Sequence, residues 1–298
     1  MPNKFFVLSQ LSRVFLACCL SVISWHAVAS ANPTSALREK YATLTDRLQQ
    51  NQFGRPLVID SSDAANQFRG DVYVVVDHSY ATVSSRLGKP QHWCDVMILH
   101  INTKSCHAVG AGSGAILQVH IGKKTPQDLA DVARVDFRFN LASGTSDYFA
   151  STLDANEGPM GTSDYHILLE AIPLSSAKTF VHLSYAYKAN LAGNLAMTTY
   201  LNTVGRNKVG FTIIGKQDDG QPEYIGGMRG VVERNAMRYY LAIDAFLDAT
   251  RAAAAMQAEK SLQQWFSATE RYPRQLREVD REAYLDMKRA ELQRQQGL

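Results

Sequence analysis

The segment from residue 71 to residue 109 constrains the fold more than any other part of the chain. It opens with an alternating apolar run, Asp71-Val-Tyr-Val-Val-Val-Asp77, and closes with a second strand-like run that reaches Cys106. Between them lies a short amphipathic stretch that ends in Trp93-Cys94. Period-two alternation predicts a strand with one buried face. We therefore expect a helix-interrupted β-hairpin, a unit of an antiparallel sheet.

The first 30 residues have the three parts of an export signal. Lys4 and Arg13 are basic, residues 14–28 are mostly apolar, and Ala27-Val-Ala29 fits a small-residue cleavage site. The alternative is a retained membrane anchor, but about 15 apolar residues fall short of the roughly 20 that a span requires. We expect a cleaved signal peptide over residues 1–30 and a periplasmic or secreted mature chain.

Cleavage would leave one pair of cysteines, Cys94 and Cys106. In an oxidising compartment an even pair normally forms a disulfide. The alternatives are free thiols or a metal site that includes His92 and His107, whose residue types suit zinc. The cysteine spacing matches no common zinc module, and adjacent residues of a strand point to opposite faces. A disulfide is the expectation, with no metal and no cofactor.

Composition and charge exclude one class of partner. The formal net charge of the 298 residues is +3, and Lys4 and Arg13 in the signal supply two of these charges. The mature chain is then near neutral and lacks a basic footprint for nucleic acid. A hydrophobic content of 46% is enough for one sizeable core. We expect one domain with helical extensions.

Strand signals dominate the chain after a first helix at residues 33–50. Further helices are expected at residues 78–97, 190–204 and 231–255, and a charged one at 274–295. The last helix has a thin apolar line, Leu276, Val279, Ala283 and Met287. The expected strands are 56–60, 71–77, 96–109, 115–121, 133–141, 165–173, 180–188, 210–215 and 221–228.

This order of elements resembles the START-like, or helix-grip, superfamily, which includes polyketide cyclases and aromatic-ligand carriers. The resemblance covers about residues 56–255, and its best-matching parts are Tyr73-Val-Val-Val-Asp-His78, Ala81-Thr-Val83, Leu87, Trp93-Cys-Asp-Val-Met97 and the helix at 231–255. It implies an α+β fold in which an antiparallel curved sheet wraps around a long C-terminal helix, with a ligand cavity between them.

The resemblance also implies a domain plan. The expected parts are a signal peptide at 1–30, an N-terminal helix at 31–52, a START-like domain at 53–256 and a C-terminal helical extension at 257–298. Two segments depart from the family pattern, the helix at 190–204 and the tail after Met256. Either segment would cap or lengthen the cavity.

The apolar faces of the strands supply candidate ligand-binding residues. Phe137 and Phe139 share one face of their strand, and charged residues occupy the other. Aromatic side chains with polar tips suit a pocket that holds an apolar body and orients one polar group, although each could equally fill a core. The candidates are Phe137, Phe139, Tyr165, Ile167, Leu169, Leu183, Tyr185, Tyr187, Arg234, Met237 and Tyr240.

No catalytic signature accompanies these residues. The run Gly110-Ala-Gly-Ser-Gly114 lacks the helix that a dinucleotide-binding loop must open, so a turn is expected. Glu170 lies in an apolar strand, where it is either an acid or base with a raised pKa or a solvent-facing or salt-bridged residue on the outer face. The glycines near residue 226, with Arg229 or Arg234, could receive an anionic head group or simply cap a helix. The catalytic residues remain unknown.

Three functions are compatible with these observations. The leading one is binding or carriage of a lipid or other hydrophobic small molecule in the periplasm. An enzyme, such as a cyclase or hydrolase acting on a bulky apolar substrate, is the first alternative. The second is an envelope scaffold whose C-terminal helices make transient contact with a protein or a membrane surface.

Overall fold

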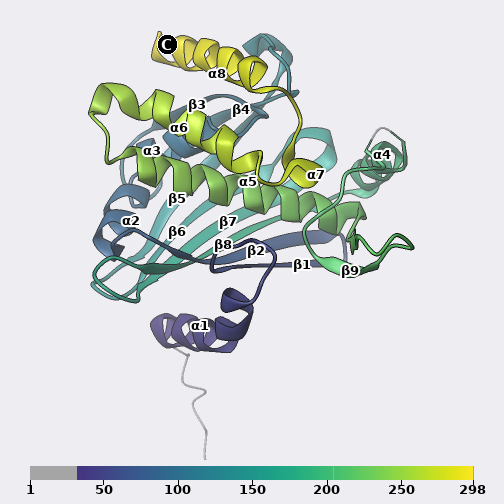
Figure 1. Cartoon of the computed structure of the whole chain (residues 1–298). Coiled ribbons are helices and arrows are strands. Elements are labelled where there is room, and N and C mark those ends of the chain that lie inside the picture. Colours follow the sequence, from purple (N-terminus) through teal and green to yellow (C-terminus); the bar gives the residue numbers. More distant parts are fainter. Residues whose placement is uncertain (1–31, 204, 298) are drawn as a thin grey trace, which may run out of the picture. The chain divides into compact units, whose positions relative to one another are not determined.

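The computed structural model describes residues 32–203 and 205–297 (Figure 1). The predicted signal peptide lies outside the described residues. The helices are α1 (Pro33–Gln49), α2 (Tyr80–Leu87), α3 (Pro90–Met97), α4 (Leu191–Asn202), α5 (Gly227–Ala249), α6 (Ala254–Thr269), α7 (Pro273–Leu276) and α8 (Arg281–Gln296). The strands are β1 (Leu57–Ala64), β2 (Gln67–Val76), β3 (Thr103–Val109), β4 (Ile116–Ile121), β5 (Ala133–Gly144), β6 (Phe149–Glu157), β7 (Thr162–Pro173), β8 (Thr179–Ala189), β9 (Ile213–Lys216) and β10 (Pro222–Tyr224).

Eight strands form one antiparallel sheet in the order β1-β2-β8-β7-β6-β5-β4-β3, and β9 pairs separately with β10. The curved sheet carries α5 across one face and α1 against the other (Figure 1). This is the helix-grip arrangement, so the predicted α+β fold is confirmed. Within the described residues, no helix is both long and apolar enough to cross a lipid bilayer.

Side-chain alternation explains why both faces of the sheet are covered. On β2, Val72 and Val74 belong to the core beneath α5, whereas Tyr73 belongs to a second apolar cluster beneath α1. On β8 the partners alternate in the same way, since Val72 pairs with Leu183 and Tyr73 with His182. Apolar side chains on both faces of these central strands therefore require a helix on each side.

Several predicted elements were wrong in part, and one strand was missed. The strand β6 was not predicted, because its sequence contains small and polar residues that mask the alternation. The predicted strand at 96–109 begins only at Thr103, since Pro90 opens a helix that runs to Met97. The long helix ends at Ala249 and a new helix begins at Ala254, so the predicted end at 255 is wrong.

The long helix α5 lies unusually close to β2 at Gly70. A Cβ atom built on this glycine would lie 2.7 Å from the carbonyl oxygen of Val232. Nearby, the buried carboxylate of Glu233 accepts hydrogen bonds from the Phe211 N–H (2.6 Å) and from the Ser61 hydroxyl (2.6 Å). The helix is thus tied to β1 and to the segment before β9.

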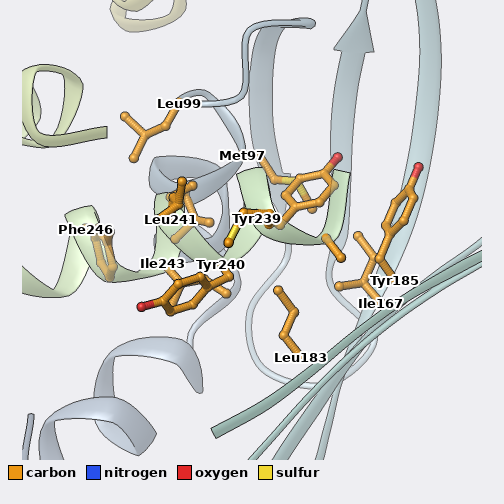
Figure 2. Close-up of a cluster of buried hydrophobic side chains, with 14 of the residues drawn as sticks. Met97, Leu99, Ile167, Leu183, Tyr185, Tyr239, Tyr240, Leu241, Ile243 and Phe246 are labelled. Carbon is orange, nitrogen blue, oxygen red and sulfur yellow. The ribbon is translucent and has the colours of Figure 1, made fainter. Parts of the chain in front are cut away.

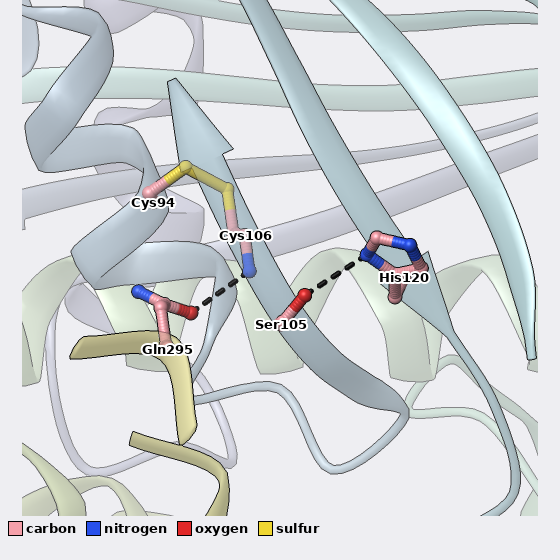
Figure 3. The surroundings of a disulfide bond; sticks show 5 residues. All are labelled: Cys94, Ser105, Cys106, His120 and Gln295. Atoms are coloured by element: carbon pink, nitrogen blue, oxygen red, sulfur yellow. Dashed lines mark hydrogen bonds between the residues drawn. A yellow bond between two sulfur atoms is a disulfide. The ribbon is translucent and has the colours of Figure 1, made fainter. Parts of the chain in front are cut away.

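The last helix, α8, covers the outer edge of the edge strand β3. Gln295 Oε1 accepts the Cys106 N–H at 2.8 Å (Figure 3), and Lys288 Nζ donates to the Thr103 carbonyl at 2.6 Å. Glu291 pairs with both Lys288 (2.8 Å) and Lys104 (3.0 Å). Side chains of α8 therefore satisfy backbone groups that an edge strand otherwise exposes.

The predicted apolar line of this last helical region is right only in part. Leu276 and Met287 are buried, but Ala283 is exposed. The packed face of α8 also includes Lys288 and Glu291, which hydropathy alone places in solvent. Their mutual ion pair makes this burial tolerable.

The predicted disulfide is present and joins α3 to β3. Cys94 and Cys106 are bonded, with their Cα atoms 5.1 Å apart (Figure 3). Both residues are buried. The bond anchors the helical part of the interrupted hairpin to the edge of the sheet, which also holds the turn that follows α3.

Replacing Gly70 with alanine should lower the free energy of unfolding by about 1 to 3 kcal/mol, because the new methyl group would push α5 from β2. Urea unfolding monitored by circular dichroism measures this. Gly144→Ala is the matched control, since its Cβ would make only an ordinary contact of 3.8 Å. Equal stability of the two variants would contradict the close packing at Gly70.

Replacing both Cys94 and Cys106 with alanine should lower the free energy of unfolding by about 2 to 4 kcal/mol, because the unfolded chain would lose its cross-link. Alanine avoids burying new hydroxyl groups. In the unaltered chain, purified and denatured without reductant, thiol labelling should leave both residues unmodified. Reduction before labelling provides the control, and labelling without reduction would refute the bond.

Candidate functional site

A pocket of about 210 Å³ lies between the sheet and α5. Its floor comes from β5, β7 and β8, one wall from α5, and another from the turn between α3 and β3. The described residues that line it are His100, Asn102, Thr103, Ile121, Phe137, Pro159, Met160, Thr162, Tyr165, Tyr185, Tyr187, Met197, Val231, Asn235 and Tyr239.

Aromatic rings form most of the apolar wall of this pocket. Tyr165 stacks on Tyr187, with ring centroids 5.4 Å apart, and meets Phe137 edge-on at 6.0 Å. Figure 2 shows Tyr239 of α5 near Tyr185, and their centroids are 5.4 Å apart. Burial raises the pKa of all four phenols, so these hydroxyls stay neutral at physiological pH.

The polar side of the pocket is centred on His100. This side chain is 5% exposed, and its ring stacks on Tyr239 at 4.9 Å. The Asn102 N–H donates to His100 Nδ1 at 3.3 Å. Nε2 has no well-aligned hydrogen-bond partner, although the neighbouring Asn235 side chain acts to raise the pKa of the ring.

Despite the effect of Asn235, the pKa of His100 lies well below its ordinary value. Burial is the largest cause, followed by the positive charges of Arg238, Lys288 and Lys124. His100 is therefore neutral at physiological pH. Because Nδ1 accepts a hydrogen bond, the proton of the neutral ring is assigned to Nε2.

The mouth of the pocket is formed by α4 and the short 3-10 turn at Pro159–Gly161. Met160 in this turn and Met197 on α4 both line the pocket. Met160 is 71% exposed, and the nearby α4 residues Leu191 and Leu195 are also exposed. The helix that departs from the family pattern thus contributes to the cap of the pocket.

The structure separates the candidate residues into two groups. Those that line the pocket are Phe137, Tyr165, Tyr185 and Tyr187. Those in the closed core are Phe139, Ile167, Leu169, Leu183, Met237 and Tyr240. Arg234 is buried and donates to the Val209 carbonyl at 3.3 Å. Arg229 likewise donates to Ser61. A ligand-binding role for any of these residues stays a prediction.

Several pocket residues were missed from the sequence, chiefly His100 and the α5 positions Val231, Asn235 and Tyr239. The apolar residues Val232, Ala236 and Tyr240 of the same helix belong to the closed core. The three α5 positions share an i, i+4, i+8 spacing that marks the adjoining stripe. Its polar member, Asn235, was the signal that could have distinguished a pocket from a core.

The alternative site at Glu170 lies on the other face of the sheet, near α1. Both ring nitrogens of His182 form hydrogen bonds to carboxylates, Nε2 to Asp71 (2.8 Å) and Nδ1 to Glu170 (2.9 Å), and the charged ring donates both. The Tyr148 hydroxyl also donates to Glu170. Burial alone would raise the pKa of Glu170, but the hydrogen bonds from His182 and Tyr148 outweigh it and lower the pKa. Of the two alternatives for Glu170, the structure contains the salt-bridged residue and not an acid or base with a raised pKa.

Metal-binding and nucleotide-binding geometry are not found in the described part of the chain. No group of three or more His, Cys, Asp or Glu residues there is placed to hold a metal ion. The predicted turn at residues 110–114 is present, and Gly110, Gly112 and Gly114 all have positive φ. A larger groove of about 410 Å³ runs between α5 and α6, but charged side chains such as Asp244, Lys260 and Arg271 line it.

Comparisons with known proteins found likeness only at the level of solved structures. No protein-family model matches, and a search of curated proteins found no relative. The Zhui aromatase/cyclase from Streptomyces sp. R1128 is 13% identical, with a TM-score of 0.39 over 63% of this chain and 98% of that one. A norcoclaurine synthase from Thalictrum flavum, in complex with dopamine and hydroxybenzaldehyde, is 15% identical, with a TM-score of 0.34 over 50% and 80%.

A third solved structure, Ara h 8.0201, is 8% identical to this chain, with a TM-score of 0.36 over 61% of this chain and 99% of that one. At such identities and TM-scores, these matches add no argument about function. The helix-grip arrangement of this chain is established by its own strand order and by the position of α5 on the sheet.

The network around His182 should make stability depend on pH. Burial lowers the pKa of His182, but its bonds to Asp71 and Glu170 outweigh burial and raise it. This contribution is complete below about pH 6.5 and is lost as pH rises through the folded pKa. The pKa values of Asp71 and Glu170 are lowered. Their contribution is complete above about pH 4.5 and is lost on further acidification.

Replacing His182 with glutamine should thus destabilise the fold by about 3 kcal/mol near pH 5.5, and by less at pH 3 and pH 9. Urea unfolding at the three pH values measures the difference from the unaltered chain. His166→Gln is the matched control, because His166 pairs with Asp154 on an exposed part of the sheet. A loss that does not vary with pH would contradict the charged network.

Proposed function

We propose that this protein binds a small, largely apolar ring compound in the pocket between the sheet and α5. The observation that carries the proposal is the wall of Phe137, Tyr165, Tyr185, Tyr187 and Tyr239 around an open volume. Aromatic rings at these separations can hold another flat ring by offset or edge-to-face contact. Buried apolar area then provides affinity, and the polar side of the pocket provides orientation.

The volume of the pocket restricts the size of the ligand. An apolar cavity of about 150 Å³ holds one benzene molecule, and drug-sized ligands occupy about 300 to 1,000 Å³. At about 210 Å³, the pocket suits a compound of one or two rings. A whole membrane lipid does not fit this volume, so the proposal narrows the expected ligand class to small hydrophobic molecules.

The pocket favours binding over catalysis. His100 is the one imidazole among the described lining residues, and none of those residues is an Asp, a Glu or a Cys. The hydroxyl of Thr162 is already engaged, since it donates to the Pro159 carbonyl and accepts from Tyr165. A nucleophile paired with a base is the usual requirement for covalent catalysis, and these residues do not provide one.

The proposal places the protein outside the cytoplasm. Two observations support this location, the signal-like residues 1–30 and the Cys94–Cys106 bond. Structural disulfides persist in oxidising compartments and are rare in the cytosol. A carrier in the periplasm or a secreted binding protein would meet small hydrophobic compounds that cross or leave the envelope.

Blocking the pocket should abolish binding and leave the fold intact. Val231→Trp places a large ring into the pocket from α5, and it should weaken binding of the neutral bicyclic probe 2-naphthamide by more than about tenfold. Isothermal titration calorimetry measures the affinity, and circular dichroism checks the fold. The matched control is Val109→Trp, at a valine that is 53% exposed.

Two outcomes would count against the proposed site. The first is the absence of a heat of binding when 2-naphthamide is added to the unaltered chain. The second is equal binding of 2-naphthamide by the two tryptophan variants. Leu169→Trp and Leu183→Trp are unsuitable for this test, because both leucines are fully buried in the closed core and a larger ring there would disturb folding.

A further inference from the structure

Two clusters of buried charge lie near the polar side of the pocket, and both contain more cations than anions. Glu278 is contacted by Arg238, Lys124 and Lys208, each at 2.7 Å. Glu291 is contacted by Lys104 at 3.0 Å and by Lys288 at 2.8 Å. Each cluster therefore keeps an excess of positive charge after its carboxylate is counted.

Most of these charged side chains are buried, whereas those of Lys124 and Lys208 are 32% and 26% exposed. The side chains of Arg238 and Glu278 are 4% and 6% exposed, and those of Lys104 and Lys288 are fully buried. Water and salt screen such charges weakly, so their potential extends across several ångströms of protein. Arg238 donates to Asn235 Oδ1 at 3.5 Å and Lys288 donates to the Thr103 carbonyl at 2.6 Å, so both cations border residues that line the pocket. Consistent with this, positive charges help to lower the pKa of His100.

The pocket itself offers no negative charge to balance this potential. None of its described lining residues is acidic, and its polar side holds the neutral His100 ring and the Asn235 amide. The Nε2 atom of His100 is a buried donor without a well-aligned hydrogen-bond partner, and the Asn235 side chain lies beside the ring. Buried donors normally have a partner, so this one indicates a group that is supplied from outside the chain.

We propose that the ligand of this pocket is a small aromatic carboxylate, whose carboxylate lies beside His100 and Asn235 and whose ring lies among the tyrosines. This inference rests on the proposed function and adds the charge of the ligand to it. The carboxylate accepts the His100 Nε2–H, and the excess cations behind the wall stabilise its negative charge. The neutral His100 donor and the Asn235 amide offer few hydrogen bonds. They therefore suit an anion with one charge, such as a carboxylate, better than a phosphate with two.

The test compares 2-naphthoate with its neutral isostere 2-naphthamide at pH 7 by titration calorimetry, using the purified chain with its disulfide intact. Naphthoate should bind about tenfold more tightly, because a hydrogen bond to a charged acceptor is stronger than one to a neutral acceptor. His100→Phe keeps a ring against Tyr239 but removes the donor. This variant should lose most of the preference for naphthoate.

A pair of lysine variants tests the role of the surrounding charge. Lys124→Met should weaken naphthoate binding by about threefold more than amide binding, because the lost charge acts on the anion alone. Lys123→Met is the matched control, since Lys123 is the exposed neighbour and its side chain forms no ion pair within the described residues. It should change neither affinity.

The outcomes separate this inference from the proposed function. If the amide binds as tightly as naphthoate, or if neither His100→Phe nor Lys124→Met alters the preference, the inferred carboxylate is wrong and the apolar site stands. If neither compound binds, the proposed function fails, and the inference that rests on it fails as well.

Discussion

The contact between α5 and β2 at Gly70 determines where every other part of the site lies. Because this residue has no side chain, the helix backbone approaches the strand until the Val232 carbonyl would touch an added Cβ atom. The buried carboxylate of Glu233 holds the same part of the helix to β1 and to the segment before β9. With α5 held here, Val231, Asn235 and Tyr239 face the neighbouring side of the sheet. On that side of the sheet, the tyrosines of β7 and β8 line the open pocket.

The opposite edge of the sheet is completed by an element with an unexpected composition. Helix α8 is rich in charge, yet it closes the β3 edge with Lys288, Glu291 and Gln295. Burial lowers the pKa of Lys288 to about 8, and Glu291 opposes this shift only in part. A buried lysine of this kind is tolerated because a carboxylate and a backbone carbonyl occupy its donors. The same arrangement places positive charge behind the turn that carries His100.

Two of the buried histidines, His100 and His182, show how local partners decide the role of a side chain. His182 uses both nitrogens on carboxylates, so it is held as a cation in a closed network and lines none of the pockets described above. His100 accepts one backbone N–H, and burial, together with the cations around it, lowers its pKa and keeps the ring neutral. Although the two histidines are buried to a similar extent, His182 is part of an ion-pair network, whereas His100 is a neutral hydrogen-bond donor at the pocket wall.

The sequence by itself determined the alternation of the strands, the pairing of Cys94 with Cys106 and the order of elements that defines the helix-grip fold. These features depend on local spacing or on an even cysteine count, so they can be read without coordinates. Of the candidate site residues, Phe137, Tyr165, Tyr185 and Tyr187 lie at the pocket, but their sequence neighbours Leu169 and Leu183 lie in the core. The alternation of apolar side chains shows which face of a strand is buried. It does not show at which residue of the strand helix α5 stops covering that face. Only the tertiary structure decided that point, together with the positions of His100 and the charges of α8. Those positions depend on contacts between segments that are more than a hundred residues apart in the chain.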